Sequence, residues 1–196
     1  VVGHLLGQNP GYVTTQGQIL ADHLLAGGND VVSCSSVKNR VLRLADIIVT
    51  ILRNKRALDL IIVEVYSGLS FVIADVASVL GNWLRIPLVA VLHGGNLPQF
   101  SNRYPRWTRR VLGRFDRRVA PSAFLARELR KLGLQLGIIP NIIDLTLYPH
   151  RLRQRLKPAL LWMRAFHAIY NPEMALQVFA EVRHKHSDAT LVMAGV

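Results

Sequence analysis

The stretch LIIVEVYSGLSFVIADVASVLGNWLRIPLVAVLHGG, residues 60–95, contains the three elements that decide the fold. Two short runs rich in β-branched residues, Leu60–Val65 and Pro87–His93, flank a longer apolar segment, Ser70–Leu84, that has the length of a helix. The two runs are apolar almost throughout and do not alternate, which is typical of strands whose sheet is covered on both faces. A strand, a helix and a second strand in this order predict a parallel βαβ unit.

The same alternation of short apolar runs and helical periods continues along the chain. Further strands are expected at Val1–Gly7, Asp30–Ser35, Arg118–Pro121, Gly137–Pro140, Leu160–Phe166 and Thr190–Ala194. Further helices are expected at Thr15–Ala26, Arg40–Ala57, Arg106–Phe115, Ser122–Leu132 and Pro172–His184. The pattern predicts an α/β fold with a Rossmann-like, doubly wound parallel sheet. Such sheets bind ligands at the carboxyl ends of their strands, so the residues that follow each strand are the candidates for a site.

The stretch Tyr148–Arg155 is polar, basic and bounded by prolines, which predicts a domain boundary within Asp144–Pro158. We therefore expect an N-terminal domain at 1–148, a linker at 149–158 and the start of a second Rossmann-like domain at 159–196. The sequence begins without Met or a signal peptide and stops at Val196 in a strand that runs into a turn, so a fragment is expected. No stretch has the ~18 uninterrupted apolar residues of a membrane span.

Composition excludes several classes of protein and leaves the charge to be explained. Half of the 196 residues are apolar, which excludes a disordered or collagen-like chain, and the single cysteine, Cys34, excludes a disulfide framework. The net charge of +12 suggests nucleic acid, an anionic membrane surface or a phosphorylated substrate as partner. Ten basic residues, named here the basic belt, lie between positions 103 and 131 against Asp116 and Glu128: Arg103, Arg106, Arg109, Arg110, Arg114, Arg117, Arg118, Arg127, Arg130 and Lys131. The alternative reading of this belt is an ordinary solvated helix face.

Two loops predict a binding cleft at the carboxyl edge of the sheet. The Asn9–Gly17 loop leads into the first helix, and its candidate residues are Asn9, Gly11, Thr14, Thr15 and Gly17. Its glycines and the free N–H groups of the helix start suit an anion. The alternative is that Thr14 or Thr15 is an ordinary helix cap. His93, followed by Gly94, Gly95 and Asn96, ends a strand and is positioned to reach a ligand or to close a turn. Other residues that follow strands are Tyr66, Ser67, Ser122 and Asn141. Glu64, inside an apolar strand, must be either paired or functional, and Asp75 poses the same choice.

Several familiar motifs are absent. The chain has neither the dinucleotide G-x-G-x-x-G nor the G-x-x-x-x-G-K-[ST] phosphate loop. Its histidines lack the spacings of a metal site, and it has no G-x-S-x-G elbow. We therefore expect neither a metal nor another cofactor.

Five segments occur in the order that one enzyme family shows. They are Pro121–Leu125, Ile139–Asp144, Leu161–His167, Asn171–Glu173 and Leu191–Gly195. Together they resemble glycosyltransferase family 4 (GT4), whose members have two facing Rossmann-like domains, the GT-B fold. The Asn9–Gly17 loop and His93-Gly94-Gly95 resemble the acceptor-side loop and active-site histidine of that family, so the resemblance covers nearly the whole chain.

The resemblance implies retaining, metal-independent transfer of a sugar from a UDP- or GDP-linked donor to a glycan or lipid-linked acceptor, as in polysaccharide biosynthesis. It implies that His93 faces the transferred sugar and that the Asn9–Gly17 loop lies near the donor phosphates or the acceptor. It also implies that the basic belt meets anionic lipid, which places the protein in the cytoplasm, free or peripheral at the inner face of the membrane. Nucleic acid is not an expected partner, because aromatic residues are not interleaved with the basic ones on a strand platform.

The chain departs from the family pattern at the expected phosphate grip. The family has Gly-Arg and, a few residues on, Lys where this chain has Arg164-Ala165 and Tyr170, so Arg164 and His167 are the candidate phosphate contacts. The E-x7-E region that holds the donor in the family is not in the sequence, so we expect the chain alone to be inactive. Two alternatives stay open: a non-catalytic module that binds a phosphorylated glycan or an anionic surface, and a nucleotide-sugar epimerase of the same fold.

Overall fold

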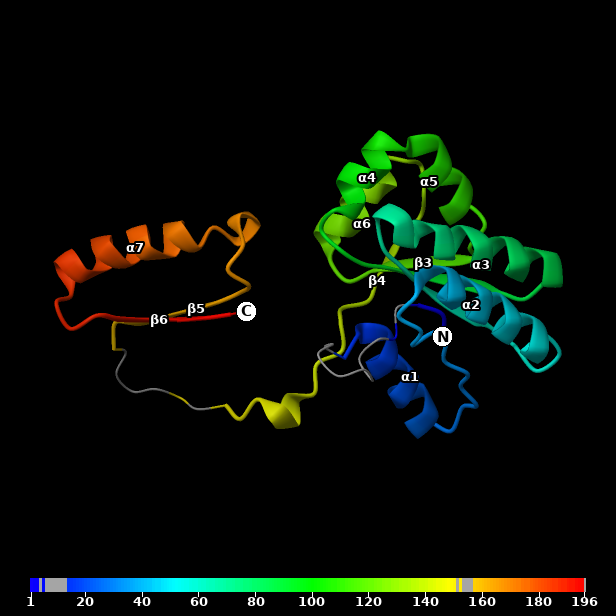
Figure 1. The fold of residues 1–196 in the computed structure, drawn as a ribbon, viewed down its shortest axis with the longest axis horizontal. Coiled ribbons are helices and arrows are strands. Elements are labelled where there is room, and N and C mark those ends of the chain that lie inside the picture. The colour runs from blue at the N-terminus through cyan, green and yellow to red at the C-terminus, as the bar shows by residue number, and fades with distance from the viewer. Residues whose placement is uncertain (4, 6–13, 151, 153–156, 196) are drawn as a thin grey trace. The chain divides into compact units, whose positions relative to one another are not determined.

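The structure is a computed structural model that describes residues 1–3, 5, 14–150, 152 and 157–195 (Figure 1). The chain divides into two compact units, Val1–Ile143 and Asp144–Val196. Among the described helices, none combines the length and the apolar character that crossing a bilayer requires.

The first unit is built on a parallel sheet. Its strands are β1 (Ile61–Val65), β2 (Leu88–Leu92), β3 (Arg117–Ala120) and β4 (Gly137–Ile138), and they lie side by side in that order. In the β1–β2 register, Ile61 pairs with Leu88 and Val65 pairs with Leu92. Helices flank this sheet, so the predicted parallel α/β fold is confirmed.

The N-terminal segment extends the sheet beyond β1. Val2 forms parallel bridges with Val63 of β1 and with Cys34, and the Val2 N–H donates to the Ile62 carbonyl at 2.8 Å. In place of the strands expected at Val1–Gly7 and Asp30–Ser35, the described residues form these isolated bridges. The chain therefore runs from Val1–Gly3 outward to Cys34 and then returns to β1 on the other side. This reversal is the topological switch point, next to which ligands bind in open α/β sheets.

Six helices belong to the described part of this unit. They are α1 (Gln16–Ala26), α2 (Arg40–Asn54), α3 (Phe71–Leu84), α4 (Leu97–Arg103), α5 (Pro105–Leu112) and α6 (Ala123–Arg130), with the short 3₁₀ turn η2 (Gly68–Ser70). A further 3₁₀ turn, η3 (Leu145–Leu147), lies at the start of the second unit. The expectation of one helix at Arg106–Phe115 was incomplete, because α4 precedes it. Pro98 is tolerated in the first turn of α4, and Tyr104, whose φ of −128° and ψ of 57° are not helical, separates α4 from α5.

The two faces of the sheet differ in their cover. Val63, Val65, Ala90 and Leu92 are fully buried in a core that includes residues of α2, α3, α5 and α6. The other face carries Glu64 and His93 and meets α1, which Figure 1 shows on the opposite side of the strands from α4, α5 and α6. The catalytic candidates thus lie on the thinly covered face.

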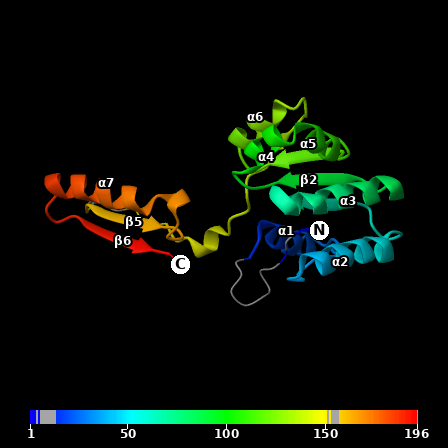
Figure 2. The ribbon, with the colours of Figure 1, turned by 45° about the horizontal axis from the view of Figure 1, so that its top comes forward.

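The second unit is a βαβ unit. It consists of β5 (Ala159–Met163), the 3₁₀ turn η4 (Ala168–Tyr170), α7 (Pro172–Lys185) and β6 (Thr190–Ala194), and β5 and β6 pair in parallel. Asn171 caps α7 by accepting from the Met174 N–H at 3.1 Å, and Pro172 takes the first position of the helix. Figure 2 shows β5 and β6 side by side with α7 along them.

Candidate active site

A buried acid and a buried imidazole meet at the carboxyl edge of the sheet. Glu64 is the fourth residue of β1, and His93 directly follows β2, where its N–H donates to the Val65 carbonyl at 2.9 Å. His93 Nε2 and Glu64 Oε2 are in contact, and the two side chains are 7% and 2% exposed. The β1–β2 register produces this pairing, because Glu64 pairs with Val91, and His93, two residues farther on, returns to the same face.

Two glycines make room for the Glu64 side chain. A Cβ on Gly3 would lie 2.8 Å from Glu64 Cβ, and a Cβ on Gly17 would lie 2.8 Å from Glu64 Cγ. Gly3 belongs to the N-terminal segment and Gly17 to the first turn of α1, so the carboxylate is enclosed where the chain reverses. A buried carboxylate is costly unless it is paired. Among the described side chains, His93 is the one in ion-pair contact with it.

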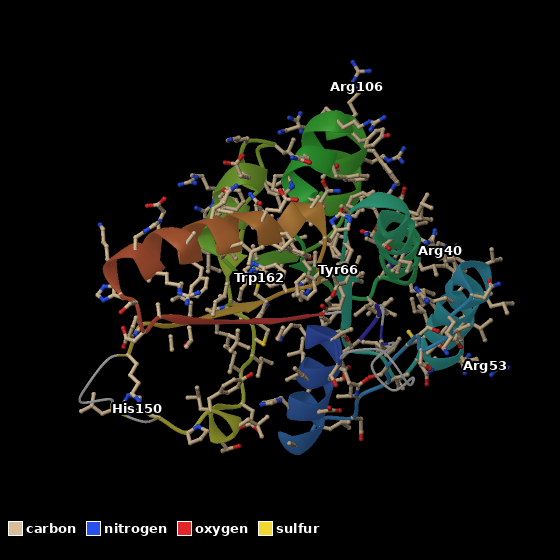
Figure 3. The ribbon with its side chains drawn as sticks, turned by 60° about the vertical axis from the view of Figure 1, so that its left-hand side comes forward. Arg40, Arg53, Tyr66, Arg106, His150 and Trp162 are labelled. Carbon is tan, nitrogen blue, oxygen red and sulfur yellow. The ribbon has the colours of Figure 1, made fainter. Side chains whose placement is uncertain are left out.

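Tyr66 closes the other side of the imidazole. Its ring stacks on His93 with centroids 5.1 Å apart and planes 20° apart. Burial, with the nearby Glu64 charge as a smaller cause, raises the pKa of Tyr66 to about 12. The phenol therefore stays protonated at neutral pH. Figure 3 labels Tyr66 near the middle of the ribbon.

A cavity of about 190 Å³ lies against this face of the sheet. Glu64, His93 and Asn141 line it together with apolar residues of β1, β2 and β3. Gln16 of α1 closes it by pairing with the backbone of Ile142: its Oε1 accepts from the Ile142 N–H at 2.9 Å and its Nε2 donates to the Ile142 carbonyl at 3.3 Å. Sequence reasoning did not single out Gln16, because a glutamine in a first helical turn carries no distinguishing signal.

The remaining candidates of this unit divide between cleft and cap positions. Asn96 Nδ2 donates to Ser67 Oγ at 3.5 Å, which joins the loops after β1 and β2. Gly94 has a φ of 87°, and a Cβ on Gly94 or Gly95 would meet no atom within 4 Å. Thr15 caps α1, Ser122 caps α6, and Thr14 is exposed. Asn9 and Gly11 lie outside the described residues.

The sequence model of Glycosyltransferase Family 4 matches residues 20–147, more than half of the chain. The chain belongs to glycosyltransferase family 4. The match covers Glu64, Tyr66, His93 and Asn141, so these residues of the site lie within the family 4 domain. The comparison with curated proteins gives no match.

The second unit carries the other candidate contacts of this family 4 protein. A cavity of about 320 Å³ lies at the carboxyl ends of β5 and β6 and is lined by Arg164, Ala165, Tyr170 and Gly195 among others. The Arg164 guanidinium lies 5.4 Å from the centre of the Tyr170 ring, a cation–π contact. His167 caps η4, where its Nδ1 accepts from the Ile169 N–H at 3.2 Å.

The basic belt of the family 4 domain is partly structural. Arg109 donates to the Leu132 carbonyl, Arg118 to the Leu112, Phe115 and Gln135 carbonyls, and Arg130 to the Leu136 carbonyl. These bonds tie loops together but leave the positive charges in place. No group of three or more His, Cys, Asp or Glu side chains in the described ranges is arranged to hold a metal ion.

Asp75 of α3 is paired with the same belt. Its carboxylate accepts from Arg114 at 2.5 Å and from the Trp107 indole N–H at 2.6 Å. Partial burial alone would raise the pKa of Asp75, but the hydrogen bonds from Trp107 and Arg114 and the charges of Arg114 and Arg110 outweigh it and hold the pKa below its usual range. Of the two readings of Asp75, pairing is therefore the one that the structure supports.

Proposed function

We propose that this family 4 glycosyltransferase transfers a sugar, with retention and without a metal, from a UDP- or GDP-linked donor to a glycan or lipid-linked acceptor. The observation that carries the proposal is the buried Glu64–His93 pair at the switch point of a family 4 domain. The first unit binds the acceptor and the second unit binds the donor.

His93 orients the reacting sugar in this proposal. Because the Glu64 carboxylate is in contact with His93 Nε2, His93 Nδ1 is the ring nitrogen that meets a hydroxyl of the transferred sugar. The stacked Tyr66 ring and the carboxylate together restrict rotation of the imidazole. Glu64 is thus a positioning residue, and His93 is the group that touches substrate.

The departing nucleoside diphosphate needs positive charge near its phosphates as the sugar bond breaks. Backbone N–H groups at a helix start and fixed cations supply this without a metal. In the second unit, Arg164 is the cation at the carboxyl edge of β5–β6, with His167 nearby in sequence. In the first unit, the start of α1 at Thr14–Gly17 is the corresponding feature.

Product analysis of the full-length protein tests the proposal. Purified protein is incubated with UDP- and GDP-sugars and saccharide acceptors, and NMR assigns the anomeric configuration of the product, with and without EDTA. We expect a longer glycan with retained configuration and no loss of rate in EDTA. An inverted product, a requirement for metal, or release of an altered sugar without transfer would contradict it, the last in favour of an epimerase.

The His93→Ala variant tests the role of the imidazole. We expect turnover to fall by about 10²-fold or more, because a preorganised polar contact to the reacting sugar is lost. His23→Ala is the matched control, since His23 is exposed on α1 and bonds the Ile19 carbonyl of its own helix. Unimpaired transfer by His93→Ala would remove the residue from the mechanism.

We also propose that the basic belt holds the protein at an anionic membrane surface, the inner face of the cytoplasmic membrane. Arg106, Arg109 and Arg110 are exposed on α5, whereas Trp107 is half-buried and bonded to Asp75, so charge is the attraction offered there. Sedimentation with vesicles tests this. Binding should require anionic lipid and weaken with salt, and equal binding to neutral vesicles would contradict the proposal.

A further inference from the structure

A second cavity of the first unit is lined in part by the loop that carries His93. It measures about 470 Å³, within the range of about 300–1,000 Å³ that is typical of small-molecule pockets. The loop after β1 contributes Gly68 and Leu69, and α4 and the start of α5 contribute most of the other lining residues. Asn96 lines it too, only three residues after His93.

Aromatic rings form one wall of this cavity. Phe100, Tyr104 and Trp107 contact one another with ring centroids 5.1–6.2 Å apart. Because the Trp107 indole N–H is held by Asp75 at 2.6 Å, the orientation of its ring is fixed. Tyr104 is 42% exposed, so an aromatic surface is available to a ligand. Flat aromatic surfaces of this kind pack against the C–H face of a pyranose ring.

The polar residues of the cavity select the kind of ligand. The Asn96 and Gln99 side chains are exposed amides. Their donors and acceptors can pair with hydroxyl groups of a ligand, whereas an acyl chain offers them no hydrogen-bonding partner. Arg103, the last residue of α4, lies over the Tyr104 ring at 5.5 Å and has no carboxylate partner within the described ranges. A guanidinium in this state binds a carboxylate or phosphate well.

We infer that this cavity binds an acidic saccharide, with a pyranose ring on the aromatic wall, hydroxyls at Asn96 and Gln99, and the acidic group at Arg103. The inference rests on the proposed function, because it makes the saccharide the acceptor of the transfer. Asn96 belongs to the loop that also carries His93, which links the cavity to the proposed reaction centre through three residues of chain.

The indole N–H signal of Trp107 reports on ligand binding, because Trp107 lines the cavity. A ¹H–¹⁵N NMR titration with cellobiouronic acid, a disaccharide that ends in a carboxylate, follows the three tryptophan indole signals, and Trp107→Phe identifies the relevant one. We expect the Trp107 signal to shift in a saturable way with the acid, and cellobiose, the neutral counterpart, to bind about tenfold more weakly. Absence of a Trp107 shift, or equal binding of the two disaccharides, would overturn the inference.

Arg103→Gln, with Arg106→Gln as matched control, separates local recognition from general charge. Arg106 is exposed on α5, extends away from the ribbon in Figure 3 and does not line the cavity. Arg103→Gln should weaken the binding of cellobiouronic acid about tenfold, and Arg106→Gln should weaken it less than twofold. Equal losses would overturn the inference, as would a loss of anionic-vesicle binding in Arg103→Gln with unchanged saccharide binding.

The transfer assay distinguishes failure of this inference from failure of the proposed function. If the full-length protein transfers sugar and Arg103→Gln does not raise the KM for an acidic acceptor, the cavity is not the acceptor site. If the Trp107 titration succeeds while no donor supports transfer, the saccharide site stands and the catalytic proposal is overturned.

Discussion

Gly17 in the first turn of α1 lies directly against the side chain of Glu64, so that a Cβ at position 17 would come within 2.8 Å of Glu64 Cγ and 3.0 Å of Cδ. The helix start and the buried carboxylate therefore occupy one tightly packed position. Because Glu64 contacts His93, the packing at Gly17 extends to the imidazole that the proposed mechanism uses.

Gly17→Ala is expected to displace the Glu64 side chain. Overpacking of this kind costs about 1–3 kcal/mol of unfolding free energy, and the shifted carboxylate no longer holds His93. The urea concentration at the unfolding midpoint and the turnover rate should therefore both fall. Gly137→Ala is the control, because a Cβ there meets Val119 Cγ1 at an ordinary 3.5 Å. Equal stability of the two variants would show that the contact at Gly17 relaxes freely.

Gln16→Ala is expected to release Ile142 from α1. The side-chain amide makes two hydrogen bonds to the Ile142 backbone, and their loss costs about 1–3 kcal/mol in a part-buried setting. The Ile142 amide should exchange faster with deuterium in the variant. Gln18→Ala is the matched control, because the Gln18 side chain donates to Asp22 of its own helix. Unchanged Ile142 exchange would mean that another group holds the segment in place.

The parallel fold was predictable because its signals are local. The runs Leu60–Val65 and Pro87–His93 became β1 and β2 within one or two residues, since a run of apolar β-branched residues between turn signals leaves few alternatives. The N-terminal strands were less predictable. Their described residues form isolated bridges at Val2 and Cys34, and bridging depends on a distant partner, Val63, and not on local preference.

The site was predictable only in its separate parts. Sequence reasoning selected His93 by its place after a strand and left Glu64 open between pairing and function. The contact between them follows from the β1–β2 register, which no local pattern encodes. The basic belt shows the same limit, because its arginines are visible in the sequence while their bonds to the carbonyls of Leu132 and Leu136 are not.

Tyr66 gives a prediction at alkaline pH. Its folded-state pKa of about 12 exceeds the ordinary tyrosine value of 10.0, so the folded protein holds this proton more tightly than the unfolded chain. The resulting stability is fully present below pH 10 and is lost as pH rises toward 12. Stability curves of wild type and Tyr66→Phe should therefore diverge in this window. Glu64→Gln should lower the pKa of Tyr66 only in part, because burial is the larger cause; a complete return to 10 would contradict that order.

Arg164→Gln is expected to weaken nucleotide binding by the full-length protein. Loss of one charge-assisted contact to a diphosphate corresponds to about tenfold in Kd, measured by calorimetry with UDP and GDP. Arg183→Gln, an exposed arginine of α7, controls for net charge in the same unit. If both variants bind nucleotide as the wild type does, other groups hold the diphosphate. The role of Arg164 is then structural, through its cation–π contact with Tyr170.

Asp75→Asn tests the link between α3 and the basic belt. The variant keeps the shape of the side chain but removes the charge that Arg114 and Arg110 face, so near neutral pH it should lose about 1–3 kcal/mol of unfolding free energy. Because the pKa of Asp75 is held below 3.8, its contribution is present above that value and is lost as pH falls through the lowered pKa. The difference between variant and wild type should therefore shrink in acid. Asp59→Asn, at an exposed position, should cost little at either pH, and a difference for Asp75→Asn that persists unchanged in acid would show that its charge is not the cause.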